Sequence, residues 1–249
     1  MRWSEADGAR RLEARMDGAT AVFSTRLGGV SAPPFDSLNL GVFTEDDRDA
    51  VVENRGRLAA ALGFPPEHVT IARQVHGAEL VAHDAPQAPS PFAEPGCAIA
   101  EADGHVTAQP SLPLLVLVAD CVPVALSGPG GVAMLHCGWR GLAAGIVVRG
   151  VEAVGATEAA IGPAIGPCCY EVGEEVLSEF AGLGDGVVSG RMLDLPEVAR
   201  RRLREAGVER IESSELCTSC EPELFFSHRR DAGRTGRQAG LVWRDGEDG

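Results

Sequence analysis

Three side chains of the types that bind zinc each follow an apolar stretch of this sequence. They are His76, Cys121 and His136. One thiolate and two imidazoles are ligands that zinc prefers, and a set of three leaves the fourth tetrahedral position for water or substrate, which distinguishes a catalytic zinc from a closed structural one. A single buried histidine or cysteine is more often a packed core residue, but three of them after apolar runs reinforce one another. The sequence therefore predicts a zinc enzyme with these three ligands at its catalytic centre.

Two aliphatic runs place two of these ligands at the ends of predicted strands. Residues 114–119 form a continuous run, which indicates a buried strand that ends just before Cys121. Residues 132–135 predict a neighbouring strand that presents His136. The spacing between the two ligands allows a strand, a turn and a returning strand, so we expect them side by side. His76 must arrive from a distant segment of the chain.

The remaining apolar patterns predict an irregular alternation of strands and helices. Glycine-rich residues 25–31 indicate a loop after a short strand. Helix caps and helical spacing predict helices over about 47–62, around 172–181 and from about 195 to 206. One more helix is expected after His136, with Leu142, Ile146 and Val154 on it. Short strands are expected at 21–24 and near 240–243. This mixture predicts the α+β class.

Length and composition predict one domain. The chain has 249 residues, of which 45% are hydrophobic, and this is enough to bury a sizeable core. We expect a single domain over residues 1–249, with a disordered tail over about 245–249.

Charge and cysteine usage exclude several classes of protein. With 36 acidic and 22 basic residues the net charge is -14, which opposes binding to nucleic acid or an anionic membrane. No apolar run reaches the roughly 18 residues of a membrane span, and residues 1–17 lack the apolar stretch of a signal peptide. Seven cysteines, an odd number, indicate free thiols in a reducing compartment. We therefore expect a cytoplasmic protein with small-molecule partners, either a monomer or a small homo-oligomer.

The other cysteines carry weaker signals. Cys217 and Cys220 have the spacing of a zinc knuckle, but a structural zinc needs a second ligand pair, and His228 alone does not supply one. Cys168 and Cys169 are adjacent and cannot easily chelate one ion, so their setting indicates a tight turn that lines a cavity. These observations argue against a second zinc.

Arginines are the candidate anion ligands of this acidic chain. Arg26 and Arg140 are the strongest candidates, and Arg73 also lies beside a motif segment. A second group lies near the C-terminus, where a salt-bridged or solvated face is the commoner role for a run of charges; it comprises Arg229, Arg230, Arg234 and Arg237. Neither a dinucleotide-binding glycine motif nor a P-loop is present, which argues against nicotinamide and nucleoside-triphosphate chemistry.

A series of short motifs runs in order from about residue 21 to 243. It comprises Thr25-Arg26-x-Gly28-Gly29-Val30-Ser31, Ser37-Leu38-Asn39-Leu40-Gly41, Gln74-Val75-His76-Gly77, Ala102-Asp103-x-x-Val106-Thr107, Ala119-Asp120-Cys121-x-Pro123, His136-x-Gly138-Trp139-Arg140-Gly141, Ile165-Gly166-Pro167-x-Cys169-Tyr170-Glu171-Val172, Phe225-Phe226-Ser227-x-Arg229-Arg230 and Thr235-Gly236-Arg237. The series resembles the laccase-domain family, whose members are also called polyphenol oxidases, peptidoglycan editing factors and purine nucleoside phosphorylases. The chain departs from the family pattern at residues 42–47 and at Gln238, which bears on substrate preference.

The resemblance implies a four-layer α-β-β-α sandwich with mixed β-sheets and a catalytic zinc at the three ligands named above. It also implies phosphorolysis of adenosine, inosine and methylthioadenosine to base and pentose-1-phosphate, with adenosine deaminase activity beside it. The expected nucleoside and phosphate contacts lie in or beside the motifs, at Arg26, Asn39, Arg73, Gln74 and Arg140. Asp120 and His105 are the candidates for the general acid and base.

Three other interpretations remain open at this stage. Cys121 and His136 are also a possible nucleophile and base for a metal-free hydrolase that edits muramyl peptide precursors. A multicopper oxidase requires more histidine ligands than this chain offers with its six histidines. A zinc-stabilised interaction module without catalysis predicts that replacing Cys121 unfolds the chain, whereas a catalytic site predicts a folded, inactive protein.

Overall fold

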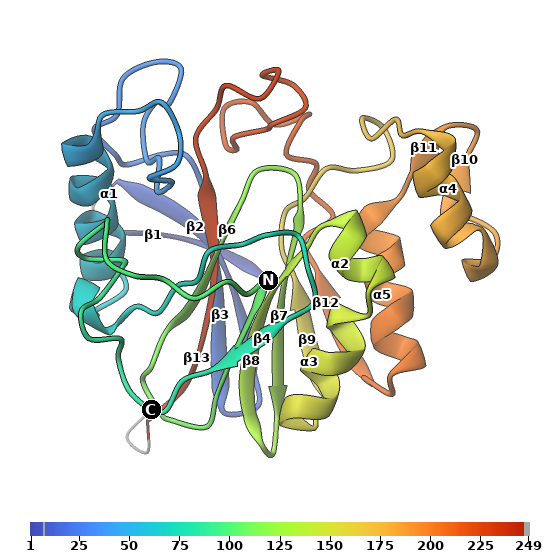
Figure 1. The fold of residues 1–249 in the computed structure, drawn as a ribbon, viewed down its shortest axis with the longest axis horizontal. Helices are drawn as coiled ribbons and strands as arrows, with labels where there is room; N and C mark the ends of the chain where they lie inside the picture. Colours follow the sequence, from blue (N-terminus) through green and yellow to red (C-terminus); the bar gives the residue numbers. More distant parts are fainter. Residues whose placement is uncertain (7, 247–249) are drawn as a thin grey trace.

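The protein consists of two β-sheets packed face to face, with helices on both outer faces (Figure 1). The structure is a computed structural model that describes every residue except 7 and 247–249. The predicted disordered tail from about 245 therefore lies mostly outside the described residues. Asp245 is described, and its carboxylate accepts a hydrogen bond from the Thr20 hydroxyl at 2.8 Å.

One sheet has five strands and is antiparallel throughout. Its order is β1 (Arg2–Ala6), β2 (Ala9–Met16), β3 (Ala19–Ser24), β13 (Gln238–Arg244) and β6 (Leu114–Val118). The second sheet has six strands in the order β12 (Arg210–Ser213), β9 (Glu158–Ile161), β7 (Val122–Gly128), β8 (Gly131–Cys137), β5 (Gly104–Thr107) and β4 (Leu80–Ala82). The pairs β12–β9 and β4–β5 are parallel, so this sheet is mixed.

The helices cover the outer faces of the two sheets. Helix α1 (Arg48–Ala61) packs on the five-stranded sheet, and α2 (Trp139–Ala143), α3 (Ile146–Val154), α4 (Glu174–Phe180) and α5 (Leu195–Glu205) lie on the side of the six-stranded sheet (Figure 1). Short elements complete the fold: the 3-10 helices Pro66–His68 and Ala181–Leu183 and the hairpin of β10 (Val188–Ser189) and β11 (Met192–Leu193). The predicted α+β class and four-layer α-β-β-α sandwich are confirmed.

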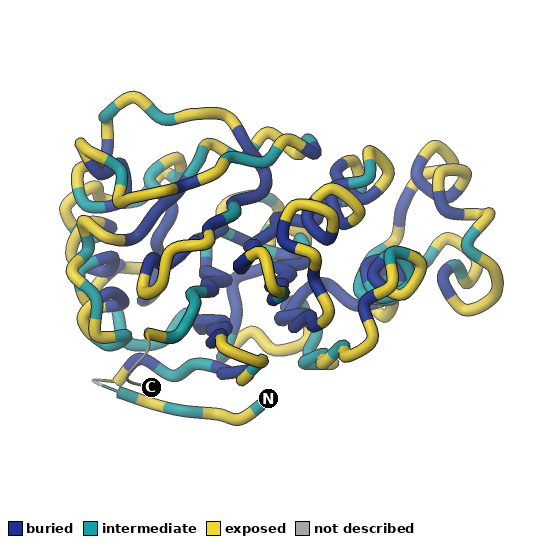
Figure 2. The backbone as a smooth tube through the Cα atoms, turned by 90° about the horizontal axis from the view of Figure 1, so that it is seen from below, coloured by how far each residue is buried: buried dark blue, intermediate teal, exposed yellow. Residues whose placement is uncertain are grey.

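The alternation of side chains along β8 explains how the central strands are buried on both faces. Val132 and Met134 pack between the two sheets, whereas Ala133, Leu135 and Cys137 pack under the helices. Side chains of successive strand residues point to opposite faces. Cys137 therefore belongs to the core beneath the helices, and His136 points toward the other sheet. Figure 2 shows that the buried parts of the backbone lie in the middle of the molecule and the exposed parts around them.

The predicted helix caps are confirmed for α1 and α5. The Asp47 carboxylate accepts a hydrogen bond from the Ala50 N–H at 2.9 Å, and Asp194 accepts one from Glu197 N–H at 2.9 Å. Such caps satisfy backbone donors that have no partner inside the helix. Gly63 follows α1 with φ of 79°, a conformation that favours glycine and ends the helix.

Three expectations about the elements need correction. The single helix predicted after His136 is divided into α2 and α3, because Gly145 lies between them with φ of 85°. Strand β8 does not pair with β6, which belongs to the other sheet; its partners are β7 and β5. Strands β1 and β2 were not predicted, because their charged side chains obscure the alternation of apolar and polar residues that marks a strand. Glu13 in β2 pairs with Arg2 of the neighbouring strand β1 and with Arg11 of its own strand.

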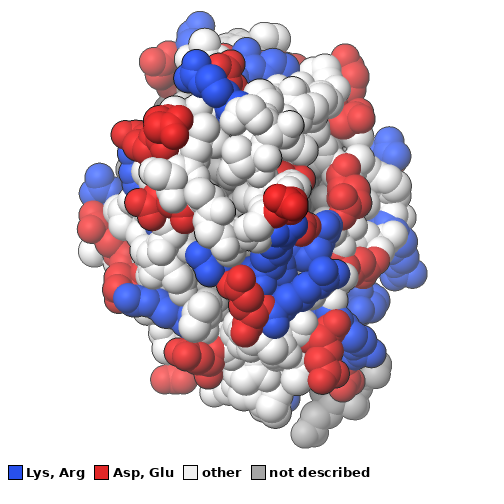
Figure 3. All heavy atoms as spheres, turned by 90° about the vertical axis from the view of Figure 1, so that its right-hand side faces the viewer, with Lys and Arg blue, Asp and Glu red and all other residues white. Residues whose placement is uncertain are grey.

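Acidic and basic side chains are interspersed on the face that Figure 3 shows, with one compact group of basic side chains near its centre. Among the described residues, no helix combines the length and apolar character needed to cross a membrane.

Candidate functional site

His76, Cys121 and His136 meet at one point of the fold, although they come from three separate segments. One ligand atom from each residue lies within 4.8 Å of the others. The rings of the two histidines lie edge to face, with their centroids 4.9 Å apart. These distances bring two imidazole nitrogens and one sulfur within reach of a single ion, since zinc bonds of about 2.0 to 2.3 Å span such a triangle.

The hairpin of β7 and β8 places Cys121 beside His136. In this hairpin Val122 pairs with Cys137 and Pro123 pairs with His136, so the start of β7 lies next to the end of β8. Cys121 immediately precedes β7. The predicted strand, turn and returning strand therefore corresponds to β7, its turn and β8, which bring Cys121 and His136 together. The strand that precedes Cys121, β6, belongs to the other sheet.

Asp103 organises both histidines and was not predicted as a site residue. Its Oδ1 lies 2.7 Å from Nδ1 of His136 and accepts a hydrogen bond from the His76 N–H at 2.9 Å, while its Oδ2 accepts one from the Gly77 N–H at 2.7 Å. A carboxylate on Nδ1 fixes the tautomer and leaves Nε2 as the ligand atom. Its place in one of the shared sequence motifs was the available signal. Burial would raise the pKa of Asp103, but the hydrogen bonds from His136 and the backbone lower it overall.

Cys121 and His136 favour opposite charges. Burial disfavours the thiolate, but the positive charge and hydrogen bond of His136, together with His76, lower the pKa of Cys121 to about 6. Burial likewise disfavours the imidazolium, yet the Cys121 thiolate and Asp103 raise the pKa of His136 to about 9. The site therefore stabilises a thiolate, which is the form of cysteine that binds metal or acts as a nucleophile.

The backbone at Gly138 approaches the ligands closely. A Cβ atom at this position would lie 3.0 Å from Cδ2 of His76 and 3.3 Å from Sγ of Cys121. A side chain here would press against two of the three potential ligands, which would have to shift by a few tenths of an ångström.

A cavity of about 1060 Å³ opens beside the three ligands. Several predicted contacts line it, namely Arg73, Gln74, Asp120 and Arg140. Tyr170 also lines it, in agreement with the expectation that the turn at Cys168 and Cys169 borders a cavity, and so do Phe43, Arg229 and Arg237, which were not predicted to do so. The cavity thus combines arginines with aromatic and apolar walls, as ligand sites commonly do.

The cavity-lining arginines differ in how much of their charge is already paired. Arg73 lies 3.4 Å from Glu101. Arg229 donates to the Glu171 carbonyl at 2.7 Å. Arg140 stacks over the Trp139 ring at 4.3 Å, and no ion pair is recorded for it in the described part of the chain. Arg140 is therefore the cation best placed to receive an anion.

Two predicted contacts do not line the cavity but support segments around it. Arg26 donates to the Asp36 carbonyl at 2.6 Å and to the Pro222 carbonyl at 3.0 Å, so its guanidinium bridges two loops. The Asn39 side-chain oxygen accepts hydrogen bonds from the backbone N–H groups of Gly41 at 3.0 Å and Arg237 at 2.8 Å. Both residues hold loops in place rather than face the cavity.

Gln74 lines the cavity, but its amide is committed to the backbone. It donates to the Leu117 carbonyl at 2.7 Å and accepts from the Leu117 N–H at 2.8 Å, which anchors the His76 loop to strand β6. The role of this side chain in the structure is to position His76.

The two candidates for proton transfer lie in different surroundings. Asp120 lines the cavity and accepts hydrogen bonds from the Thr218 hydroxyl at 2.6 Å and the Arg229 N–H at 2.7 Å. His105 is fully buried in β5, where its Nδ1 lies 3.0 Å from Nε2 of His83. Burial and the neighbouring His83 lower the pKa of His105 to about 3, so it stays neutral. Asp120 is the member of this pair that can reach a ligand.

The C-terminal run of arginines divides between two roles. Arg230 pairs with Asp231 at 2.8 Å and Arg234 with Glu45 at 3.0 Å, in agreement with the predicted salt-bridged face. Arg229 and Arg237 instead turn toward the cavity, which that prediction missed.

Comparison with known proteins identifies relatives of this chain over most of its length. The family model described as multi-copper polyphenol oxidoreductase laccase matches residues 20–245. The chain is 41% identical to purine nucleoside phosphorylase YlmD of Geobacillus stearothermophilus, over 91% of this chain and 90% of that protein. It is 40% identical to purine nucleoside phosphorylase YfiH of Escherichia coli strain K12, over 91% and 94% of the two chains.

Solved structures agree with these sequence matches. The crystal structure of the hypothetical protein YfiH of Bacillus licheniformis superposes with a TM-score of 0.88 at 36% identity, covering 97% of this chain and 98% of that one. The crystal structure of YlmD from Geobacillus stearothermophilus gives 0.86 at 39% identity, with 98% of each chain covered. The chain belongs to the multi-copper polyphenol oxidoreductase laccase family, together with proteins named purine nucleoside phosphorylase YfiH and YlmD.

Proposed function

We propose that this chain is a zinc-dependent purine nucleoside phosphorylase. It cleaves adenosine, inosine and methylthioadenosine with phosphate into base and pentose-1-phosphate, and has adenosine deaminase activity as a side reaction. The observation that carries this proposal is the convergence of His76, Cys121 and His136 on the wall of a cavity of about 1060 Å³, which is large enough for a nucleoside and a phosphate. The names of the relatives support the same activity.

The donor set fits zinc. Two imidazoles and one thiolate suit a borderline-soft divalent cation, and three protein ligands beside a cavity leave room for a further ligand. When bound, zinc supplies positive charge and Lewis acidity at this wall of the cavity. Asp103 holds His136 through Nδ1, so Nε2 is the atom that His136 presents.

The arginines of the cavity account for the second substrate. In phosphorolysis a phosphate oxygen forms a bond to C1′ of the ribose while the C1′–N9 bond breaks, and the purine leaves with the electron pair and takes up a proton. Arg140, with Arg73 and Arg237, which line the same cavity, would hold the phosphate through charge-assisted hydrogen bonds. Such local charges outweigh the net charge of -14, because pairs in a cavity are screened less than distant surface charges.

Asp120 is the proposed proton-transfer residue. Its carboxylate is held by Thr218 and Arg229, and each oxygen keeps a further lone pair for a substrate proton. It directly precedes Cys121 in the sequence, and both residues line the cavity.

A second candidate function rests on the charges of Cys121 and His136. A thiolate with its pKa lowered to about 6 beside an imidazole is also the arrangement of a cysteine nucleophile and its base. In that case the chain would be a metal-free hydrolase of muramyl peptide precursors. The two functions differ in one measurable property, since only the phosphorylase loses activity when metal is removed with a chelator and regains it with zinc.

Chromatography of adenosine reactions with and without phosphate tests the proposal. We expect adenine and ribose-1-phosphate only when phosphate is present. Equal amounts of adenine without phosphate would mean hydrolysis, and inosine formed in either reaction reports deamination. The His76→Ala variant, purified in parallel, excludes a contaminating phosphorylase from the expression host.

A further inference from the structure

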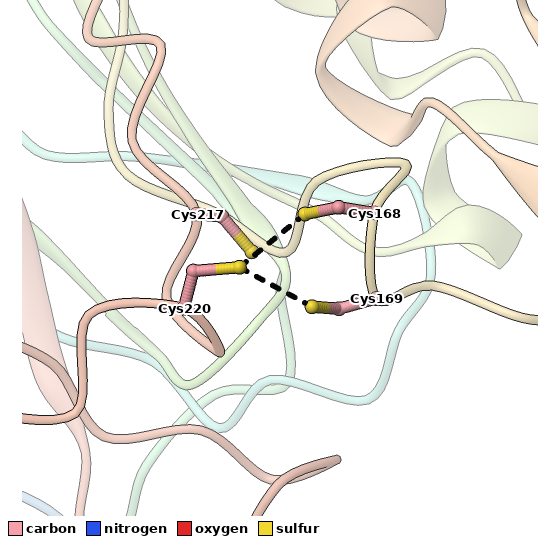
Figure 4. Close-up of side chains that lie close together, drawn as sticks. All are labelled: Cys168, Cys169, Cys217 and Cys220. Atoms are coloured by element: carbon pink, nitrogen blue, oxygen red, sulfur yellow. Dashed lines mark hydrogen bonds between the residues drawn. The ribbon is translucent and has the colours of Figure 1, made fainter.

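Four cysteines from two segments that are distant in sequence form a second cluster of potential metal ligands. Cys168 and Cys169 lie in the turn after β9, and Cys217 and Cys220 lie in the loop after β12 (Figure 4). One sulfur from each lies within 4.8 Å of the others. In the sequence, Cys217 and Cys220 have no second ligand pair nearby, and for this reason no second zinc was predicted. The structure corrects this assumption, because the other loop supplies that pair. It also corrects the expectation that the adjacent Cys168 and Cys169 cannot easily chelate one ion, since both of their sulfurs lie 3.4 Å from Sγ of Cys220.

Parallel pairing of β9 and β12 brings the two loops together. Both strands run in the same direction, from the pair Arg210 and Glu158 to the pair Ser213 and Ile161, so their following loops leave the sheet at the same edge. A further bridge between Ala164 and Cys217 keeps the chains parallel beyond the strands. The cluster is therefore built into the topology of the six-stranded sheet.

The distances between the sulfurs match those of a tetrahedral metal site. Sγ of Cys220 lies 3.4 Å from Sγ of Cys168 and 3.4 Å from Sγ of Cys169. In a tetrahedral zinc site with Zn–S bonds of about 2.3 Å, neighbouring sulfurs are roughly 3.8 Å apart. This separation lies between the two sulfur–sulfur distances of 3.4 Å and the 4.8 Å within which all four sulfurs lie. The Gly166 N–H also points at Sγ of Cys217 at 3.3 Å, and such a donor stabilises and orients a thiolate ligand.

A disulfide explains the cluster less well than a metal does. A disulfide joins two sulfurs and gives no reason for four to converge, and here Cys220 is equally close to both cysteines of the other loop. All four thiols are free in the structure. Four thiolates without a carboxylate or water position match a closed structural zinc site.

We propose that Cys168, Cys169, Cys217 and Cys220 bind one zinc ion as a structural site, separate from the His76, Cys121 and His136 site. The metal would fasten together two loops that support the cavity. Tyr170, which lines the cavity, directly follows Cys169. Thr218, between the other two cysteines, donates its hydroxyl hydrogen bond to Asp120 at 2.6 Å. The second zinc thus braces the segment that carries Cys121.

Metal analysis of the purified full-length protein tests the proposal. We expect two zinc ions per chain, one of which is lost in the double variant Cys217→Ser/Cys220→Ser and the other in His76→Ala. Cys97→Ser, which replaces a free cysteine outside both clusters, should keep both ions. A wild-type protein with one zinc that the double variant retains would overturn the proposal. One iron in place of the second zinc, or a disulfide among the four cysteines in a thiol titration of the denatured protein, would do the same.

A measurement on the wild-type chain keeps the proposal testable even if the double variant fails to fold. Cadmium NMR of cadmium-loaded protein distinguishes ligand sets, because a site with four thiolates resonates at higher frequency than one with a single thiolate. Two separate resonances are expected, and a single resonance from the mixed site alone contradicts the proposal. The phosphorylase proposal is judged separately, since it depends on the metal that His76→Ala removes.

Discussion

The two clusters of potential metal ligands differ in their ligands and in their surroundings. The cluster of His76, Cys121 and His136 has three mixed ligands and faces a large cavity, whereas the cluster of four cysteines joins two loops at the edge of a sheet. Three ligands with adjoining space are suited to chemistry, and four thiolates are suited to holding chains together. The difference teaches that the proposed division into a catalytic and a structural site rests on the number of ligands and the space beside them, rather than on the spacing of the ligands in the sequence.

The largest effect is expected from removing the thiolate of the mixed site. Cys121→Ala should lower kcat/KM for adenosine phosphorolysis by about 1,000-fold or more, because it removes one of the three proposed metal ligands. Its thermal melt should stay close to that of the wild type, since Cys121 is only partly buried. Kinetics and circular dichroism melts check both points. If the variant is unfolded, the metal bound by His76, Cys121 and His136 stabilises the fold, and the proposed distinction between a catalytic and a structural cluster is wrong.

The next largest effect should come from the residue that orients the ligands. Asp103→Asn removes the carboxylate that accepts hydrogen bonds from His76 N–H and faces Nδ1 of His136. Replacing a residue that orients a metal ligand through a hydrogen bond typically lowers metal affinity or activity by about 10- to 100-fold. Competition with a zinc chelator should show weaker binding of one of the two zinc ions, with the second unchanged. A loss of both ions would mean that the clusters are not independent.

The part of the mixed site formed by Cys121 and His136 was predictable because both residues lie beside recognisable strands, whereas His76 lies in a loop that no sequence pattern placed. Residues 114–119 and 132–135 are continuous aliphatic runs, and the hairpin spacing between Cys121 and His136 fits β7 and β8. The caps of α1 and α5 were readable for the same reason, since capping is local chemistry.

The four-cysteine cluster was not predictable from local patterns. It depends on the pairing of β9 with β12, which joins segments about fifty residues apart, and single-sequence periodicity does not encode strand partners. Asp103 was missed for a related reason. An acid beside a short strand gives no periodic signal, and its importance comes from the contacts with His76 and His136 that only the fold creates.

A moderate effect on substrate binding is expected at the arginine with the fewest partners. Arg140→Ala should raise KM for phosphate by about 10-fold, since a hydrogen bond to a charged group contributes about 1.5 to 3 kcal/mol. KM for adenosine should change less. Arg57→Ala is the matched control, because Arg57 is exposed on α1, pairs with Glu53 and does not line the cavity. An unchanged KM for phosphate in Arg140→Ala would move the anion site to Arg73 or Arg237.

The smallest effect on activity should come from a substitution at the rim of the cavity. The four cysteines of the other cluster do not line this cavity. Phe43 lines the cavity with 79% of its surface exposed and lies in the segment where the chain departs from the family pattern. A purine that stacks on such a ring gains about 1 kcal/mol or more. Phe43→Ala should therefore raise KM for adenosine about 5- to 10-fold and leave both zinc ions and the thermal melt unchanged. Steady-state kinetics at saturating phosphate measures this, and a fall in kcat with constant KM would place Phe43 in the chemical step instead of nucleoside binding.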